Sequence, residues 1–268
     1  FALGDRFEMV AAVLSSVPYH HKVVHFHGGE KSFGSLDNKY RHAITSLSDI
    51  HFASTETHSS RIKDIIEDKN ISNVYNIGSL ALNNLLNINS DEEKLLSSIK
   101  YKFGKKNALV CFHPTLEDDY GAMRLSNILE SLTERNFNIL ITSPNNDPGH
   151  KDLINVIDNF LLRNKNAFFE KNLGGDKYFS FLKKMNLLVG NSSSGIIEAA
   201  SLGTYVINIG NRQDGRAQSP NTFNIHGDDL NQLKKLILKI EKLDNYSGEN
   251  IYFKRNGLEI VEKVLRNE

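Results

Sequence analysis

The motif with the clearest chemistry is GNSSSGIIE at residues 190–198, which follows an apolar run and opens an amphipathic stretch. A small residue such as Gly195 lets a backbone approach a ligand, and the hydroxyls of Ser192 and Ser193 can donate hydrogen bonds. Free N–H groups where a helix begins favour an anion such as a diphosphate. Glu198 lies about one turn further, where a carboxylate can accept from sugar hydroxyls. The alternative is a helix capped by Ser192 or Ser193 without any ligand.

A second loop, INIGNRQDGR at residues 207–216, follows the next apolar run. Its two arginines, Arg212 and Arg216, stand at the carboxyl end of a predicted strand, where open α/β sheets bind ligands. Guanidinium groups match phosphate in a bidentate way, so the loop predicts phosphate binding. A solvated turn is the alternative.

Acidic residues follow two predicted strand ends in the first part of the chain, which places Asp5 and Glu30 at the carboxyl edge of neighbouring strands. Asp5 lies in GDRFE at residues 4–8, and Glu30 closes HFHGGE at residues 25–30. Carboxyl groups with separated pKa values suit proton abstraction and return, and we expect a cleft between domains to raise one pKa by desolvation. Each acid taken alone is equally compatible with a surface carboxylate. Asp37, Arg41 and His42 follow closely.

One further candidate, His113, precedes Pro114 at the end of another apolar run. The proline holds His113 in an extended backbone, and we expect its imidazole to point into the crevice between domains. A buried core histidine is the alternative. Cys111, inside the apolar run, is interpreted as buried filler rather than a nucleophile. The two histidines flanking Phe26 are weak evidence for a metal, so none is expected.

Strands and helices, recognised by their different hydrophobic periodicities, must position these residues. Short apolar runs alternate with stretches of period near 3.6, which predicts βαβ units around parallel sheets. The predicted strands are Lys22–His27, His51–Ala53, Val74–Ile77, Ala108–Phe112, Asn138–Thr142, Ala167–Phe169, Leu187–Gly190 and Tyr205–Ile209. Apolar spacing predicts helices over residues 7–14 and 230–240, the acids at 91–93 favour a connecting helix, and a final helix is expected over Ile251–Arg266.

The alternation of short apolar runs and helical stretches breaks between residues 83 and 106, where we place a domain boundary. The predicted domains are the C-terminal part of a first Rossmann-like domain at 1–85 and a second Rossmann-like domain at 86–250. The helix at 251–268 packs on the second domain or crosses back to the first. One continuous doubly wound sheet with a long insertion is the alternative.

Composition narrows the class of protein. The chain has 268 residues, with 32 basic and 32 acidic side chains, so no net field attracts nucleic acid or an anionic membrane. Its single cysteine excludes an internal disulfide and fits a reducing cytoplasm. No apolar run approaches the ~20 residues that span a bilayer. The chain opens on Phe1 without an initiator methionine, so we expect preceding elements.

Several segments in one order resemble the UDP-N-acetylglucosamine 2-epimerases. They are GDRFE and HFHGGE, LDNKYRHAIT at 36–45, HFASTE at 51–56, NIGS at 76–79, FHP at 112–114, GNSSSGIIEA at 190–199 and INIGNRQDGR at 207–216. HGGE and FHP are typical of the hydrolysing branch, which supplies N-acetylmannosamine for sialic acid. Non-hydrolysing relatives typically carry HVEAGLR and GHRRE-like segments instead.

The resemblance implies a GT-B architecture, α/β with two Rossmann-like domains whose parallel sheets face a cleft, a C-terminal helix that returns to the first domain, and an N-terminal domain that is truncated here. Position by position, it implies catalytic roles for Asp5, Glu30, Asp37, Arg41, His42 and His113. It implies UDP contacts for Ser192, Ser193, Gly195 and Arg212, with Glu198 on the ribose. The expected reaction removes the C2 proton, eliminates UDP to a glycal and adds water, giving N-acetylmannosamine and UDP.

The expected substrate is UDP-N-acetylglucosamine or a bacillosamine-type relative, for sialic acid-type sugars and surface polysaccharide. No cofactor is expected, because elimination needs no hydride carrier and GxGxxG is absent. Family analogy favours a homodimer, with neither nucleic acid nor membrane as a partner. A GT-B glycosyltransferase and a non-catalytic nucleotide-sugar binder are the alternatives. Without preceding strands we expect the isolated chain to be poorly active.

Overall fold

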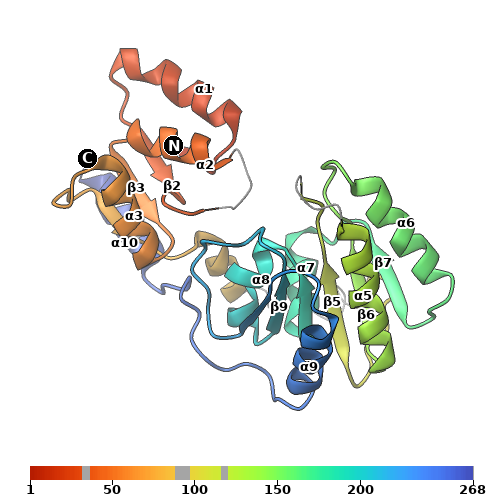
Figure 1. The fold of residues 1–268 in the computed structure, drawn as a ribbon. Coiled ribbons are helices and arrows are strands. Elements are labelled where there is room, and N and C mark those ends of the chain that lie inside the picture. Colours follow the sequence, from red (N-terminus) through yellow and green to blue (C-terminus); the bar gives the residue numbers. More distant parts are fainter. Residues whose placement is uncertain (32–36, 88–96, 116–119, 268) are drawn as a thin grey trace. The chain divides into compact units, whose positions relative to one another are not determined.

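The structure is a computed structural model that describes residues 1–31, 37–87, 97–115 and 120–267 (Figure 1). The chain forms two compact units, each built around one parallel sheet. Unit 1 comprises Phe1–Asn84, Asp214–Ala217 and Ile251–Glu268, and unit 2 comprises Leu85–Gln213 and Gln218–Asn250. The predicted α/β class with two parallel sheets is confirmed. The short segment Asp214–Ala217 groups with unit 1, although both of its flanks belong to unit 2.

Unit 1 has a four-stranded sheet in its described residues, in the order β1-β2-β3-β4. The strands are β1 (Ala2–Leu3), β2 (Val24–Phe26), β3 (Ile50–Ala53) and β4 (Val74–Asn76), all parallel. The helices are α1 (Phe7–Ser16), α2 (Asp37–Ser46), α3 (Glu56–Ile66) and α10 (Gly257–Arg266), with short turns of helix η1 (Val17–Tyr19) and η2 (Leu80–Asn87). Apolar residues of α1 and α2 form one core cluster, and those of α10 pack in another with β2 and β3.

Helix α3 shows how the local sequence sets an element. The Thr55 side chain caps its first turn by accepting from the backbone N–H of His58 at 3.2 Å. Ile62 is fully buried, and the helix ends at Glu67, which adopts a left-handed φ of 60°. This capping fixes where His58 enters the interior of unit 1, one turn after the end of β3.

The final helix begins at Gly257 rather than at Ile251, so the predicted range is wrong at its start. Residues 251–256 bond to other segments instead of forming helical turns. The carbonyl of Tyr252 accepts from the N–H of Ser79 at 2.7 Å, and its hydroxyl donates to the carbonyl of Ala217 at 2.8 Å. At Gly257 a Cβ atom would lie 2.0 Å from the Ile77 carbonyl oxygen, so this close approach requires glycine.

Unit 2 has a six-stranded sheet in its described residues, in the order β10-β9-β8-β5-β6-β7. The strands are β5 (Asn107–Cys111), β6 (Asn138–Thr142), β7 (Ala167–Glu170), β8 (Leu187–Gly190), β9 (Tyr205–Ile209) and β10 (Thr222–Ile225). The helices are α5 (Gly121–Glu134), α6 (His150–Leu161), α7 (Gly174–Lys183), α8 (Ser193–Ile197), η3 (Ala199–Leu202) and α9 (Leu230–Ile240). Strand order reverses between β5 and β8, where open α/β sheets bind ligands.

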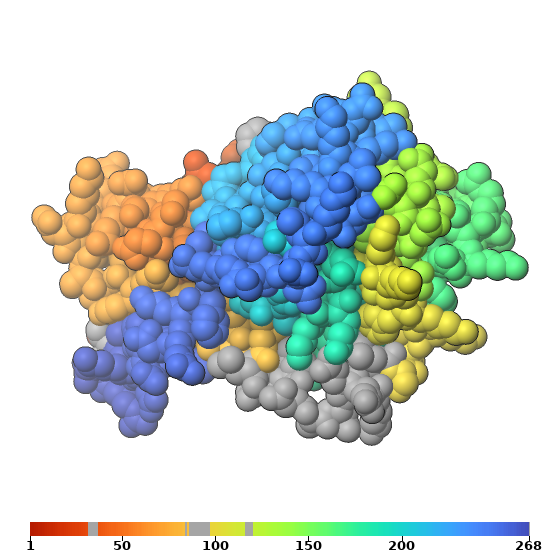
Figure 2. Space-filling view, turned by 90° about the horizontal axis from the view of Figure 1, so that it is seen from below, coloured from red at the N-terminus to blue at the C-terminus, as the bar shows by residue number. Residues whose placement is uncertain are grey.

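The core of unit 2 fills both faces of its sheet. Ala108 and Val110 of β5 pack with α5, α6 and α9, whereas Leu109 packs on the opposite face with α7. This alternation follows from the two-residue period of a strand. Helices α5 and α9 lie side by side on the face shown in Figure 2, joined by the Lys234–Glu134 ion pair at 2.7 Å.

All eight predicted strands are present; three have the predicted bounds, and the other five differ by one or two residues at one or both ends. Strand β10 was missed because it is a four-residue edge strand and three of its residues are half-buried, so it lacks a strong apolar pattern. The predicted connecting helix at 91–93 lies outside the described residues. Among the helices that the structure describes, none is long and apolar enough to cross a membrane.

Candidate active-site groups

The buried carboxylate of Glu30 is the centre of a polar cluster in unit 1. Glu30 is 4% exposed and follows β2 through the glycine pair at 28–29. Its Oε1 accepts from Nδ1 of His27 at 2.8 Å and from Oγ of Ser54 at 2.9 Å. Its Oε2 lies 3.5 Å from Nη2 of Arg216 in an ion pair. Three side chains from separate segments thus hold the two oxygens of one carboxylate.

The pKa of Glu30 differs from the expectation that desolvation raises the pKa of one acid at this site. Burial by itself raises the pKa of a carboxyl group, but the hydrogen bond from His27 and the charge of Arg216 outweigh it and hold the pKa of Glu30 well below its usual range. The prediction that desolvation raises a pKa in the acid pair is therefore wrong for Glu30. Glu30 is ionised at neutral pH.

Arg41 of α2 connects Glu30 with Asp5. Its Nη2 donates to Oδ2 of Asp5, and its Nη1 donates to the backbone carbonyl of Glu30 at 2.8 Å and to Asn38 Oδ1 at 3.2 Å. The Arg41 side chain is 3% exposed and that of Asp5 is 23% exposed. Because β1 and β2 are parallel neighbours, the residues following them meet at one sheet edge, as the sequence predicted for Asp5 and Glu30.

Asp37 and His42 lie on the same helix as Arg41. Asp37 is the first residue of α2 and is half-buried. The Nε2 atom of His42 is buried and has no hydrogen-bond partner among the described residues. Partial burial, together with the charges of Arg41 and Lys31, lowers the pKa of His42. A lowered pKa favours the neutral form of the His42 imidazole at pH 7.

The serine motif, GNSSSGIIE at residues 190–198, follows β8 in unit 2, as predicted. Ser192 caps α8, its Oγ accepting from the N–H of Ser194 at 3.4 Å and lying 3.1 Å from the Ser194 hydroxyl. The capping described as an alternative is thus present, and α8 has only five residues. Glu198 follows directly as the C-terminal cap of this helix and is half-buried.

The glycines of the serine motif have packing roles that the sequence did not reveal. Gly190 has a φ of 149°, and a Cβ there would lie 2.0 Å from the Cys111 carbonyl oxygen. A Cβ at Gly195 would lie 2.9 Å from Cγ1 of Val206. Gly195 therefore allows α8 to pack closely on the sheet, which is a different role from the backbone approach to a ligand expected above.

Asn191 connects three loops at the carboxyl ends of β5, β8 and β9. Its side chain accepts from the N–H of His113 at 2.7 Å and donates to the carbonyl of His113 at 2.8 Å. Its own backbone carbonyl accepts from Arg212 at 3.0 Å and Gln213 at 2.8 Å. No role was predicted for Asn191, although its position inside the GNSSSGIIE motif was the available signal.

His113 is held in one tautomer. Burial and the charge of Arg212 lower the pKa of His113 to about 4, so the imidazole is neutral at pH 7. Its Nδ1 accepts from the backbone N–H of Asn145 at 3.1 Å, which leaves the proton on Nε2, 3.6 Å from Sγ of Cys111. Burial raises the pKa of the Cys111 thiol, in keeping with its interpretation as buried filler.

The two arginines of the 207–216 loop have different partners. Arg212 belongs to unit 2 and contacts Asn191, whereas Arg216 belongs to unit 1 and pairs with Glu30. In addition, Nε of Arg216 donates to the Lys31 carbonyl at 3.2 Å. The sequence predicts phosphate binding by this loop, and the structure shows that Arg216 compensates a buried carboxylate.

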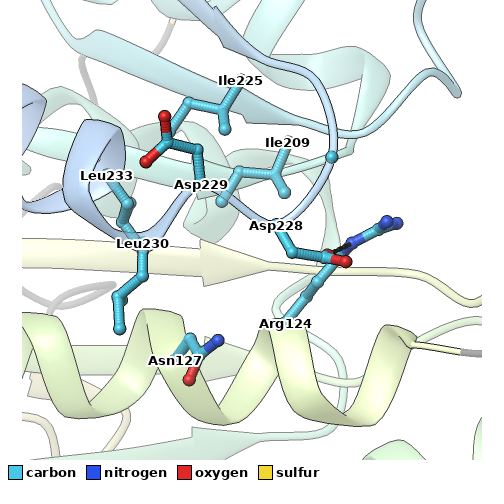
Figure 3. A pocket seen from close by; sticks show the side chains of 9 residues that line it. Arg124, Asn127, Ile209, Ile225, Asp228, Asp229, Leu230 and Leu233 are labelled. Atoms are coloured by element: carbon cyan, nitrogen blue, oxygen red, sulfur yellow. Dashed lines mark hydrogen bonds and ion pairs between the residues drawn. The ribbon is translucent and has the colours of Figure 1, made fainter.

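A small cavity in unit 2 lies beside α5 and the ends of β9 and β10 (Figure 3). Its volume of about 20 Å³ holds roughly one water molecule. Arg124 and Asp228 form an ion pair at its edge, with Nε and Oδ1 2.5 Å apart. The cavity is too small for a nucleotide. Among the described residues, no group of three or more His, Cys, Asp or Glu could hold a metal ion.

Two α/β units with parallel sheets and polar groups at strand ends define a GT-B type of protein. A profile of the family described as UDP-N-acetylglucosamine 2-epimerase matches residues 1–266. The chain belongs to the UDP-N-acetylglucosamine 2-epimerase family, which confirms the resemblance seen in the sequence.

Similar proteins agree with this family. A GDP/UDP-N,N'-diacetylbacillosamine 2-epimerase (hydrolyzing) of Campylobacter jejuni is 34% identical, covering 89% of this chain and 62% of that protein. A UDP-N,N'-diacetylbacillosamine 2-epimerase (hydrolyzing) of Legionella pneumophila is 31% identical, covering 83% of this chain and 59% of that protein. The chain thus spans about three-fifths of the length of these relatives.

A solved structure shows the same fold. The crystal structure of UDP-GlcNAc 2-epimerase from Neisseria meningitidis bound to UDP-GlcNAc matches with a TM-score of 0.77 at 18% identity, covering 99% of this chain and 75% of that one. At this identity the comparison supports the fold alone.

Proposed function

We propose that this chain is part of a hydrolysing 2-epimerase that converts UDP-N-acetylglucosamine, or a bacillosamine-type UDP-sugar, into the free 2-epimeric sugar and UDP. The observation that carries the proposal is the ionised, buried Glu30, held by His27, Ser54 and Arg216 in a chain of this family. Relatives at 34% and 31% identity, named as hydrolysing enzymes, support the branch.

Unit 1 supplies the proton-transfer groups in this proposal. Removal of the C2 proton and its return need carboxyl groups, and Asp5, Glu30 and Asp37 are the candidates. Arg41 orients two of them, because it donates to the Asp5 carboxylate and to the main chain of Glu30. His42 offers a neutral imidazole nitrogen without a protein partner among the described residues, which suits a hydrogen bond to the sugar.

Unit 2 supplies the binding site for the uridine diphosphate in this proposal. Ser192 and Ser193 donate to phosphate oxygens, Gly195 sets the position of their helix, and Glu198 accepts from the ribose. Arg212, oriented by the carbonyl of Asn191, stabilises the departing diphosphate. His113, whose main chain is held by the Asn191 side chain, donates through Nε2 as a neutral group.

The proposal extends to the setting of the enzyme. We propose the domain limits 1–85 and 86–250 with the helix at 251–268, a homodimer, a location in the cytoplasm and a role in sialic acid-type sugar and surface polysaccharide synthesis. The family assignment supports these points by analogy.

The test uses the full-length protein in deuterated water, with UDP-N-acetylglucosamine and UDP-N,N'-diacetylbacillosamine in parallel. We expect release of UDP and a free sugar that carries deuterium at C2. The better substrate identifies the sugar class. Release of UDP that depends on an added acceptor would instead indicate a glycosyltransferase, and binding without turnover would indicate a non-catalytic binder.

A further inference from the structure

Ser54, directly after β3, is a buried residue that neither the sequence motifs nor the family resemblance assigns to the reaction. It is 1% exposed, and its hydroxyl lies 2.9 Å from Oε1 of Glu30 and 2.9 Å from Nδ1 of His58. His58 is fully buried one turn into α3. The three side chains therefore form a continuous chain of polar contacts that ends on a proposed catalytic carboxylate.

The direction of these hydrogen bonds follows from the number of protons. A serine hydroxyl has one proton, and an ionised carboxylate can only accept. Because Glu30 is ionised, Ser54 donates to Glu30, and its oxygen is left to accept from His58. Burial lowers the pKa of His58 to about 4, so its ring carries a single proton at pH 7, and that proton must lie on Nδ1.

The other contacts of His58 restrict the orientation of its ring. Nε2 of His58 is buried and has no hydrogen-bond partner among the described residues, so the ring is anchored through Nδ1. The Thr55 cap holds the N–H of His58 at the helix start. At Gly29, a Cβ would lie 2.3 Å from the His58 carbonyl oxygen, so the turn before Glu30 packs directly on α3.

We propose that Ser54 and His58 are positioning residues for Glu30, with His58 donating through Nδ1 to Ser54 and Ser54 donating to the carboxylate. This inference rests on the proposed function, because Glu30 acts on substrate only there. His27 and Ser54 together hold Oε1, and Arg216 lies 3.5 Å from Oε2, so these contacts fix the orientation of the whole carboxylate. Arg41 and Arg61 fix the main chain around it through the carbonyls of Glu30 and Gly29.

The first experiment measures kcat and KM for UDP release by the full-length protein at pH 7.5, where Glu30 is ionised. Ser54→Ala removes one donor to an ionised carboxylate, so kcat should fall roughly tenfold, with KM changed less. Ser54→Thr restores the hydroxyl and should return kcat toward wild type. Ser59→Ala is the matched control, because Ser59 is buried on α3 beside His58 and its hydroxyl donates to the carbonyl of Thr55 at 3.2 Å.

A second measurement needs no turnover and therefore separates this inference from the proposed function. The 15N NMR spectrum at pH 7.5 should show neutral His58 protonated on Nδ1, and this resonance should shift in Ser54→Ala, with His58→Gln for assignment. A His58 protonated on Nε2, or a His58 resonance that Ser54→Ala leaves unmoved, would overturn the inference. A kcat that falls equally in Ser59→Ala would do the same, whereas absence of UDP release by wild type would refute only the proposed function.

Discussion

Acid should unfold unit 1 early, because three of its histidines are buried in the neutral form. His25, His51 and His58 are all fully buried. Burial lowers the pKa of each from 6.5 to about 4. Between these values the unfolded chain binds protons that the folded chain does not, so stability falls as pH drops below 6.5 and continues to fall until about pH 4.

The size of the effect follows from the two pKa values. A difference of about 2.5 in pKa is worth about 3 kcal/mol for each histidine, of which about 2 kcal/mol is already lost at pH 5. Three such residues therefore remove about 6 kcal/mol at pH 5, which is comparable with the whole stability of a small domain, about 5–15 kcal/mol.

The assay is chemical denaturation followed by circular dichroism between pH 7.5 and 5. His51→Phe should remove about one third of the pH dependence, since the three residues contribute about equally. Phe52→Leu, in the same strand and 1% exposed, is the control and should lower stability by the same amount at every pH. A free energy of unfolding that stays constant from pH 7.5 to 5 would refute the reasoning.

Three further outcomes follow from the contacts. Gly195→Ala should lower the stability of unit 2 by about 1–3 kcal/mol in denaturant, because its Cβ would meet Val206; no loss would mean that α8 can shift freely. Asn191→Ala leaves the N–H and carbonyl of His113 without their partner, so stability should fall by about 1–3 kcal/mol and the KM for UDP-sugar should rise; an unchanged KM would contradict its organising role. A lysine at position 41 cannot donate at once to the Asp5 carboxylate and to the Glu30 carbonyl, as the Arg41 guanidinium does. In Arg41→Lys, kcat for UDP release should therefore fall roughly 100-fold, with the fold intact by circular dichroism. A fall of less than threefold would argue that Arg41 does not orient these acids.

The sequence by itself determined eight of the described strands, the fold class and the family. Apolar runs of three to six residues mark a parallel sheet because both of its faces are buried, which is why β5, with all five residues buried, was evident from its sequence. The edge strand β10 shows the limit of that signal, because half-buried residues leave no pattern. The placement of Asp5 and Glu30 at one sheet edge also followed from sequence, since parallel neighbours end on the same side.

Only the tertiary structure decided which side chains meet. Ser54 contacts Glu30 across 24 positions of sequence, and Asn191 contacts His113 across 78. The structure also gives Arg216 and Arg212 different partners, Glu30 and Asn191. It lowers the pKa of Glu30, whereas burial alone would raise it. The physical reason is that a sequence pattern reports the burial of a position, whereas a hydrogen bond depends on strand register and on the rotation of each side chain about its own backbone.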